Sequence, residues 1–166
     1  MDTEPLQSID VAIVGAGVAG ATTARALARW RLNVVVLEAG NDVACGATRA
    51  NSGIVHAGYD PLPGTLKARF NAAGSKLFPQ WADELGFSYV RNGSLVLAER
   101  NRGGVLSQLK ERGEKNGVKG LEVIDRARAL ALEPHLGDGV AAALYAPTGG
   151  IVCPFQLTIA AMGNAM

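Results

Sequence analysis

The sequence predicts an α/β fold, α+β overall, in which a parallel sheet is followed by the start of a second domain that contains a β-sheet. Two observations carry this prediction. Residues 10–38 read as a strand, a glycine turn, a helix and a second strand that stops at an acid. Residues 87–146 mix short strands and helices without a nucleotide-binding motif of their own. We therefore divide the chain into a nucleotide-binding part, 1–86, a substrate-side portion, 87–146, and a returning helix, 147–166.

The first strand and its turn carry the strongest local signal. Residues 11–14 are an apolar run that suits a buried strand and is too short for a helix. Three glycines follow with G-x-G-x-x-G spacing; they allow a tight turn, a close approach of backbone amides to a pyrophosphate, and close helix–strand packing. The helix that follows directs its positive N-terminal end at that anion. The residues expected to bind the cofactor here are Gly15, Ala16, Gly17, Val18, Ala19 and Gly20.

The flanking sequence supports a dinucleotide site. A glycine motif alone is weak in a chain with 21 glycines, and a glycine turn without a nucleotide is the alternative. Residues 33–37, however, read as a second parallel strand, expected to be buried on both faces. Glu38, next to Ala39, follows the last glycine at about the spacing of an acid that accepts ribose hydroxyls. The pattern indicates a Rossmann-like sheet with a bound dinucleotide.

Composition excludes several classes of protein. The formal net charge of +1 argues against a nucleic-acid surface. No apolar run approaches membrane-spanning length, and the acidic, polar N-terminus does not read as a secretory signal. Cys45 and Cys153 are far apart, so we expect reduced thiols in a cytoplasmic protein, with no metal site.

A long loop, residues 41–59, follows the second strand. Small and polar residues dominate it, and loops of this length in compact domains are usually functional. A disordered surface loop is the alternative, but the apolar Ile54 and Val55 in the middle of the segment argue against it. We expect the loop to line a ligand.

The stretch ATRANSGIVHAGYDPLPGTLKARFN, residues 47–71, together with the glycine motif, resembles FAD-dependent oxidoreductases of the D-amino-acid-oxidase type. Bacterial anaerobic-type glycerol-3-phosphate dehydrogenases are the nearest match, and L-2-hydroxyglutarate oxidases share the NSG-x-x-H-x-G and P-G-x-L-K-A-R pieces. RNGSLVLA, residues 91–98, and APTGGIVCPFQL, residues 146–157, extend the resemblance to nearly the whole chain.

The resemblance implies FAD rather than NAD. It places Glu38 at the ribose, His56 beside the flavin ring, where its imidazole could relay a proton, and Tyr59 at the substrate pocket. A structural hydrogen-bonding role for His56 and a packing role for Tyr59 are the alternatives. Residues implied on the pyrophosphate and isoalloxazine side are Thr48, Arg49, Asn51, Ser52 and Gly53.

The remaining chain predicts a helix over 66–86, with a packed stripe of Leu66, Phe70, Ala73, Leu77 and Trp81 and a kink or a second helix at Pro79. Further expected elements are a hairpin about Asn92-Gly93, a helix over 101–116, a strand over 121–124, a helix capped by Asp125, a strand over 140–145 and a helix from Pro154. Candidate anion contacts, with solvated surface charge as the alternative, are Lys67, Arg69, Arg91, Arg126 and Arg128.

Proteins of the resembled family are considerably longer, so we expect this chain to be a truncated part that folds poorly alone or self-associates and holds FAD weakly. The implied substrate is a small anionic 2-hydroxy compound such as glycerol 3-phosphate, with 2-hydroxyglutarate second. The sequence is also compatible with a catalytically inert dinucleotide-binding module or an NAD-dependent dehydrogenase. It leaves open the electron acceptor and any peripheral membrane or partner-subunit association.

Overall fold

The computed structural model describes residues 8–99 and 103–166. The chain forms two compact units. The first unit comprises Met1–Gly53, Trp81–Ser88 and Val152–Met166. The second unit comprises Ile54–Gln80 and Tyr89–Ile151. These units are divided by packing, and the functional division at residues 86 and 146 stays a prediction.

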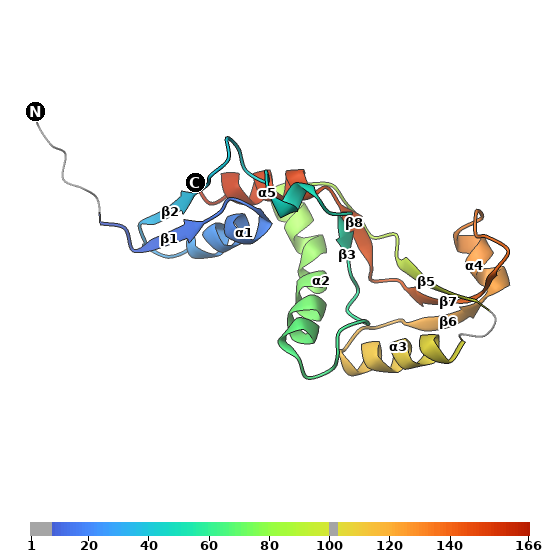
Figure 1. Ribbon diagram of the computed structural model, residues 1–166. Coiled ribbons are helices and arrows are strands. Elements are labelled where there is room, and N and C mark those ends of the chain that lie inside the picture. The colour runs from blue at the N-terminus through green and yellow to red at the C-terminus, as the bar shows by residue number, and fades with distance from the viewer. Residues whose placement is uncertain (1–7, 100–102) are drawn as a thin grey trace, which may run out of the picture. The chain divides into compact units, whose positions relative to one another are not determined.

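The first unit contains the predicted strand–helix–strand. Strands β1, Val11–Val14, and β2, Val34–Leu37, pair in parallel with Val11 opposite Val34. Helix α1, Val18–Leu27, connects them and buries Ala21 and Ala24. Helix α5, Pro154–Gly163, begins at the predicted proline and packs beside α1 (Figure 1). The parallel pair and both helices are confirmed.

The expectation that these strands are buried on both faces is wrong for this chain. Val14 is 87% exposed and Leu37 is 52% exposed. Side chains alternate across a strand, so α1 covers only one set of them.

The turn from α1 to β2 lacks glycine, and hydrogen bonds hold it. The backbone N–H of Asn33 donates to Asp10 Oδ2 at 2.8 Å, and its side-chain amide donates to the carbonyl of Ser8 at 2.9 Å. Asn33 makes this turn without a left-handed backbone, because Ala44 is the sole non-glycine residue with positive φ in the described part of the chain.

The second unit is built on an antiparallel sheet. Strands β5, Ser94–Glu99, β7, Val140–Ala146, and β6, Glu122–Asp125, lie in the order β5-β7-β6. Helix α3, Gly103–Lys115, packs Leu106 against Leu144 on one face. Helix α4, Arg126–Leu132, packs Ala129 against Ala143 on the other face (Figure 1). Because neighbouring residues of β7 face opposite sides, each helix covers its own face of the sheet.

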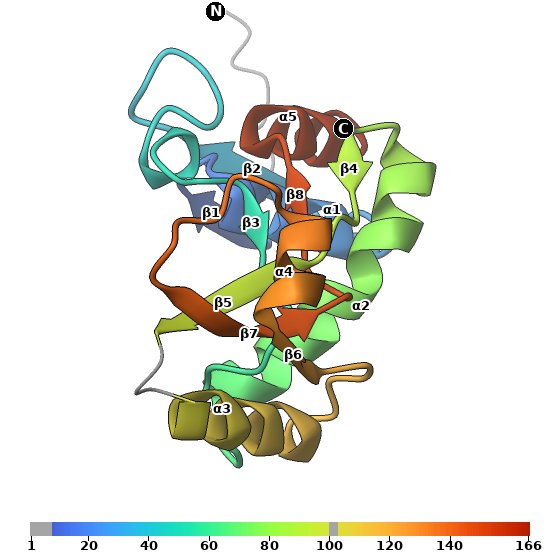
Figure 2. The same ribbon diagram turned by 90° about the vertical axis from the view of Figure 1, so that its right-hand side faces the viewer.

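A smaller sheet explains why the expected hairpin is wrong. Strands β3, Ile54–Val55, β8, Gly150–Val152, and β4, Tyr89–Val90, lie in the order β3-β8-β4, and Figure 2 shows β8 between the other two. Strand β4 therefore pairs with β8, whereas β5 pairs with β7. Gly93 has the expected positive φ of 76°, but its N–H donates to the Gly149 carbonyl at 2.9 Å. The Asn-Gly turn moves the chain from one sheet to the other.

Helix α2, Leu66–Leu85, corrects two further expectations. It is one α-helix that includes Pro79, so a separate second helix is wrong. Its predicted stripe is not core, because Leu66 is 67% exposed and Phe70 is 62% exposed. The buried positions are Ala68, Ala72 and Ser75. At Ala72 the backbone of Gly58 comes close, since a Cβ at Gly58 would lie 3.4 Å from the Ala72 Cα.

Candidate functional site

The glycine turn between β1 and α1 depends on its first and third glycines. Gly15 has a φ of +99°, a conformation that side chains disfavour, and its N–H donates to the Leu37 carbonyl at 2.7 Å. A Cβ on Gly20 would lie 1.9 Å from the Gly15 carbonyl oxygen. Gly17 is the N-cap residue of α1 and has no side chain that could cap the helix. Gly17 thus leaves the N–H groups at the start of α1 without a cap from its own side chain, which suits an anion site at a helix N-terminus.

Thr48, from a distant part of the chain, accepts one of the N–H groups at this end of the helix. It belongs to the 3₁₀ helix η1, Ala47–Arg49, and its buried hydroxyl accepts the N–H of Val18 at 2.9 Å. A Cβ on Gly17 would lie 3.0 Å from the same oxygen. The second glycine therefore makes room for Thr48 beside the turn.

Glu38, directly after β2, is bonded to the glycine turn. Its Oε2 accepts the N–H of Ala16 at 2.6 Å, and its Oε1 accepts the N–H of Gly40 at 2.8 Å. The backbone hydrogen bonds from Ala16, Gly40 and Ala39 stabilise the ionised form and lower the pKa of Glu38 below its ordinary 4.5. An exposed carboxylate at this position can also accept hydroxyl groups of a ribose.

A groove opens beside Glu38. The N–H of Ala44 donates to the Ala16 carbonyl at 3.0 Å, with Ala44 buried and at a φ of 61°. This bond holds residues 40–44 against the glycine turn. The groove has a volume of about 700 Å³, and its lining includes Ala16, Glu38, Gly40, Asn41, Asp42 and Val43. Its size lies within the range of small-molecule sites, and of the predicted cofactor residues it includes Ala16 and Glu38. The rest of its lining comes from the later part of α1, from β2 and from the C-terminal residues, so the start of α1, predicted to bind the pyrophosphate, does not line it.

The remaining predicted cofactor residues form the end of the same loop. The Asn51 side chain donates to the Thr48 carbonyl and accepts the N–H of Gly53 at 2.7 Å, so it orders its own loop. A Cβ on Gly53 would lie 2.3 Å from the Val152 carbonyl oxygen, which explains the glycine. Arg49 and Ser52 are exposed. The ligand contacts expected of these residues stay predictions.

His56 and Tyr59 lie in the second unit, whereas every predicted cofactor residue lies in the first. They share a cavity of about 110 Å³ lined by His56, Gly58, Tyr59, Asp60, Pro61, Lys67 and Asn71. His56 is exposed and Tyr59 half-buried. The Oδ1 atom of Asn71 is buried and has no hydrogen-bond partner among the described residues. The two predicted catalytic residues are thus brought together with a cation and an amide.

Helix α3 and the residue after it hold the Tyr59 segment, a relationship that the sequence did not reveal. The Asn116 side-chain amide donates to the carbonyls of Gly58, at 3.0 Å, and Pro61, at 2.8 Å. Arg112 donates to the Asp60 carbonyl at 2.9 Å. A Cβ on Gly113 would lie 2.8 Å from the Tyr59 Cβ. These residues are 52 or more positions from the segment they hold, and no local motif marks them.

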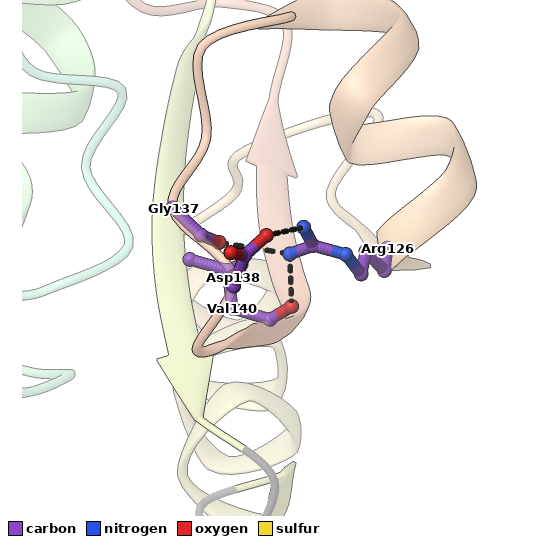
Figure 3. Close-up of polar contacts among 4 residues, drawn as sticks. All are labelled: Arg126, Gly137, Asp138 and Val140. Carbon is purple, nitrogen blue, oxygen red and sulfur yellow. Dashed lines mark hydrogen bonds and ion pairs between the residues drawn. The ribbon is translucent and has the colours of Figure 1, made fainter.

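Two of the arginines considered as anion contacts are engaged in structural bonds. Figure 3 shows Arg126, the first residue of α4, donating to the carbonyls of Gly137, at 2.8 Å, and Val140, at 2.7 Å, and pairing with Asp138. Arg128 pairs with Glu122 at 3.0 Å. The N-cap role predicted for Asp125 is confirmed, since its carboxylate accepts the N–H of Arg128 at 2.8 Å.

Comparison with known proteins assigns the family. The family model described as FAD dependent oxidoreductase (DAO) matches residues 10–166. The chain belongs to the DAO family of FAD dependent oxidoreductases. FAD is therefore the family's dinucleotide, as the resemblance implied.

Individual relatives agree with this assignment. A glycerol 3-phosphate dehydrogenase of Caloramator mitchellensis is 46% identical over 158 residues, covering 95% of this chain and 33% of the relative. A mitochondrial L-2-hydroxyglutarate dehydrogenase of Nematostella vectensis is 37% identical over 160 residues, covering 95% of this chain and 35% of the relative. The solved structure of the L-α-glycerophosphate oxidase of Mycoplasma pneumoniae with FAD bound matches with a TM-score of 0.87 at 30% identity. The match covers 94% of this chain and 42% of the oxidase chain. The chain thus spans 33% to 42% of these relatives' lengths.

No helix in the described ranges is both long and apolar enough to span a membrane. Cys45 and Cys153 are free thiols.

Proposed function

We propose that this DAO-family chain is the FAD-binding part of a dehydrogenase or oxidase that oxidises a secondary alcohol, with glycerol 3-phosphate as the substrate. The observation that carries the proposal is the bonded set of glycine turn, Thr48 and Glu38 at one end of β1 and β2. The 46% identity to a glycerol 3-phosphate dehydrogenase favours this substrate.

The chain's own residues would hold the cofactor as follows. The N–H groups at the start of α1, apart from that of Val18, which donates to Thr48, would bind the pyrophosphate, and the α1 dipole would add to that attraction. Glu38, whose pKa lies below its ordinary 4.5, is ionised near neutral pH and would accept the ribose hydroxyls. Arg49 and Ser52 contribute the exposed polar groups of the flavin side. When bound, FAD would supply the acceptor for the hydrogen of the substrate's alcohol carbon.

In the second unit, His56 would accept the proton of the substrate hydroxyl, a role that suits an imidazole near neutral pH. Lys67 lines the same cavity and would attract the anionic group of the substrate. Tyr59 would close one side of it. We propose that the protein is cytoplasmic. We also propose that it contacts a partner subunit or a membrane surface, which receives the electrons from the flavin.

L-2-hydroxyglutarate is the second candidate substrate, because a dehydrogenase for that compound is 37% identical over 160 residues. Both compounds are anionic secondary alcohols, so the same cofactor and base would serve either. They differ in whether a phosphate or a second carboxylate must be bound.

A reduction experiment tests the proposal. The chain is held with FAD under anaerobic conditions, and the visible flavin absorbance is followed after addition of each compound. Bleaching by glycerol 3-phosphate alone supports the proposal, and bleaching by L-2-hydroxyglutarate alone selects the second candidate. A bound flavin that neither compound bleaches contradicts the proposal and leaves a dinucleotide-binding module.

Two matched variants then test the base. The chain has two histidines, and His135 lies in an exposed turn after α4. His56→Gln should slow bleaching by about 100-fold or more, in the usual range for loss of a general base. His135→Gln should leave the rate unchanged. Equal rates for the two variants would remove His56 from the mechanism.

A further inference from the structure

A second cavity in the second unit has a different character from the one beside His56. It has a volume of about 360 Å³ and is lined by Ala57, Ala72, Ser75, Lys76, Arg91, Gly117, Val118, Lys119 and Thr148. Ala57, Ala72 and Val118 are buried, so the floor is apolar. Three cationic side chains stand at the rim, and the lining contains no acid. We refer to it as the basic cavity.

The cations of the basic cavity come from three separate parts of the chain. Lys76 is on α2, Arg91 lies between β4 and β5, and Lys119 follows α3. In the ion pairs found among residues 8–99 and 103–166, none of the three takes part. Arg126 and Arg128, by contrast, each have a carboxylate partner. Like charges gathered without a counter-charge favour an anionic ligand.

Two polar side chains, those of Thr148 and Arg91, indicate where an anion would bind in the basic cavity. The Oγ1 atom of Thr148 is buried and has no hydrogen-bond partner within the described ranges. A buried hydroxyl without a partner costs free energy unless a ligand or water satisfies it. Arg91 uses its Nε to donate to the Pro147 carbonyl at 3.3 Å, and Arg91 and Thr148 both line the cavity. The bond to Pro147 thus ties Arg91 to the residue next to Thr148.

The basic cavity is separate from the His56 cavity. Ala57 and Ala72 line the basic cavity, whereas His56, Gly58 and Asn71 line the other. Successive residues of the same two segments therefore line different cavities.

We propose that the basic cavity binds a small organic anion, a phosphate or carboxylate carried on a compact apolar group, at a site that shares no lining residue with the predicted cofactor residues or with the His56 cavity. The cations and the Thr148 hydroxyl bind the anionic group, and Ala57, Ala72 and Val118 contact the apolar part. The volume is near the lower end for small-molecule sites. This proposal goes beyond the oxidation of a secondary alcohol and does not depend on it.

Calorimetric titration of the full chain with phenyl phosphate, inorganic phosphate and anionic lipid vesicles tests the proposal. Phenyl phosphate should bind more tightly than inorganic phosphate because of the apolar floor, and affinity for both should fall as salt is raised. Binding to vesicles without binding to either soluble phosphate would overturn the proposal.

Variants show where the anion binds. Lys76→Gln with Lys119→Gln should weaken phenyl phosphate binding by about tenfold or more. Thr148→Val should also weaken phenyl phosphate binding, although it removes no charge. Lys110→Gln with Lys115→Gln removes the same charge from ion pairs on α3 and should leave affinity unchanged. Equal losses in the two double variants would show non-specific attraction and overturn the site.

Discussion

The Glu38 carboxylate and the Ala16 N–H are 22 residues apart in sequence and form a hydrogen bond of 2.6 Å. Glu38 directly follows β2, and Ala16 lies in the glycine turn after β1. Because parallel strands present their carboxyl ends at one edge, the acid and the turn meet there without a ligand. The carbonyl of Ala16 also accepts the N–H of Ala44 at 3.0 Å. One residue therefore joins the turn, the acid and the loop.

We expect Glu38 to make stability depend on acid pH. Its pKa is lowered from 4.5, chiefly by the backbone hydrogen bond from Ala16. The carboxylate therefore stabilises the fold at pH above 4.5, and this contribution is lost as the pH falls through the lowered native pKa. Glu38→Gln should reduce the difference between urea midpoints at about pH 7 and about pH 3.5. Glu114→Gln, an exposed carboxylate on α3, is the control, and an equal reduction there would contradict the assignment.

Gly20→Ala should destabilise the chain by about 1–3 kcal/mol, because the added Cβ would overlap the Gly15 carbonyl oxygen. Gly74→Ala is a matched change inside α2, where a Cβ meets nothing within 4 Å. It should stabilise by about 0.5–1 kcal/mol, since alanine is the better helix former. Urea unfolding measures both. A Gly20→Ala chain as stable as the parent would refute the close approach.

Thr48→Val should cost about 1–3 kcal/mol, because it leaves the Val18 N–H without its acceptor. Thr48→Ser keeps the hydroxyl and should recover most of the loss. Thr23→Val, on the exposed side of α1, serves as the control and should change stability by less than about 0.5 kcal/mol. Thermal unfolding followed by circular dichroism measures all three. Thr48→Ser and Thr48→Val chains of equal stability would exclude the capping role.

Asn116→Ala should loosen the segment that carries Tyr59. The change removes two donors and leaves the carbonyls of Gly58 and Pro61 unpaired, at a cost of about 1–3 kcal/mol. Faster amide hydrogen exchange at Gly58 and Tyr59 is the expected signature. Lys115→Ala removes only an exposed ion pair with Glu111 and should leave that exchange unchanged. Unchanged exchange in Asn116→Ala would show that the segment is held by other contacts.

The sequence predicted the parts of the fold that local chemistry determines. Gly15, Gly20 and Glu38 carry a spacing that backbone geometry imposes, and the structure has the expected strand–helix–strand. Pro154 and Asp125 likewise start the helices predicted from helix-end preferences.

The incorrect predictions concern positions where residues distant in the sequence determine the pairing or the burial. Asn92-Gly93 has the composition of a hairpin turn, but β8, more than 50 residues later, pairs with β4. The stripe of Leu66 and Phe70 has helical periodicity, yet the close backbone at Gly58 selects the face with Ala72 for burial. Asn116, which holds the segment that carries Tyr59, is marked by no local sequence motif, because its partners are backbone carbonyl groups.

Equilibrium titration of the chain with FAD, followed by quenching of flavin fluorescence, tests the central claim that residues 8–53 form a dinucleotide site. We predict saturable binding by the parent chain, weaker binding by Glu38→Gln, and none by Gly20→Ala, while Gly74→Ala binds like the parent. A folded parent chain that does not quench the flavin, or a Gly20→Ala chain that binds as tightly as the parent, would contradict the account.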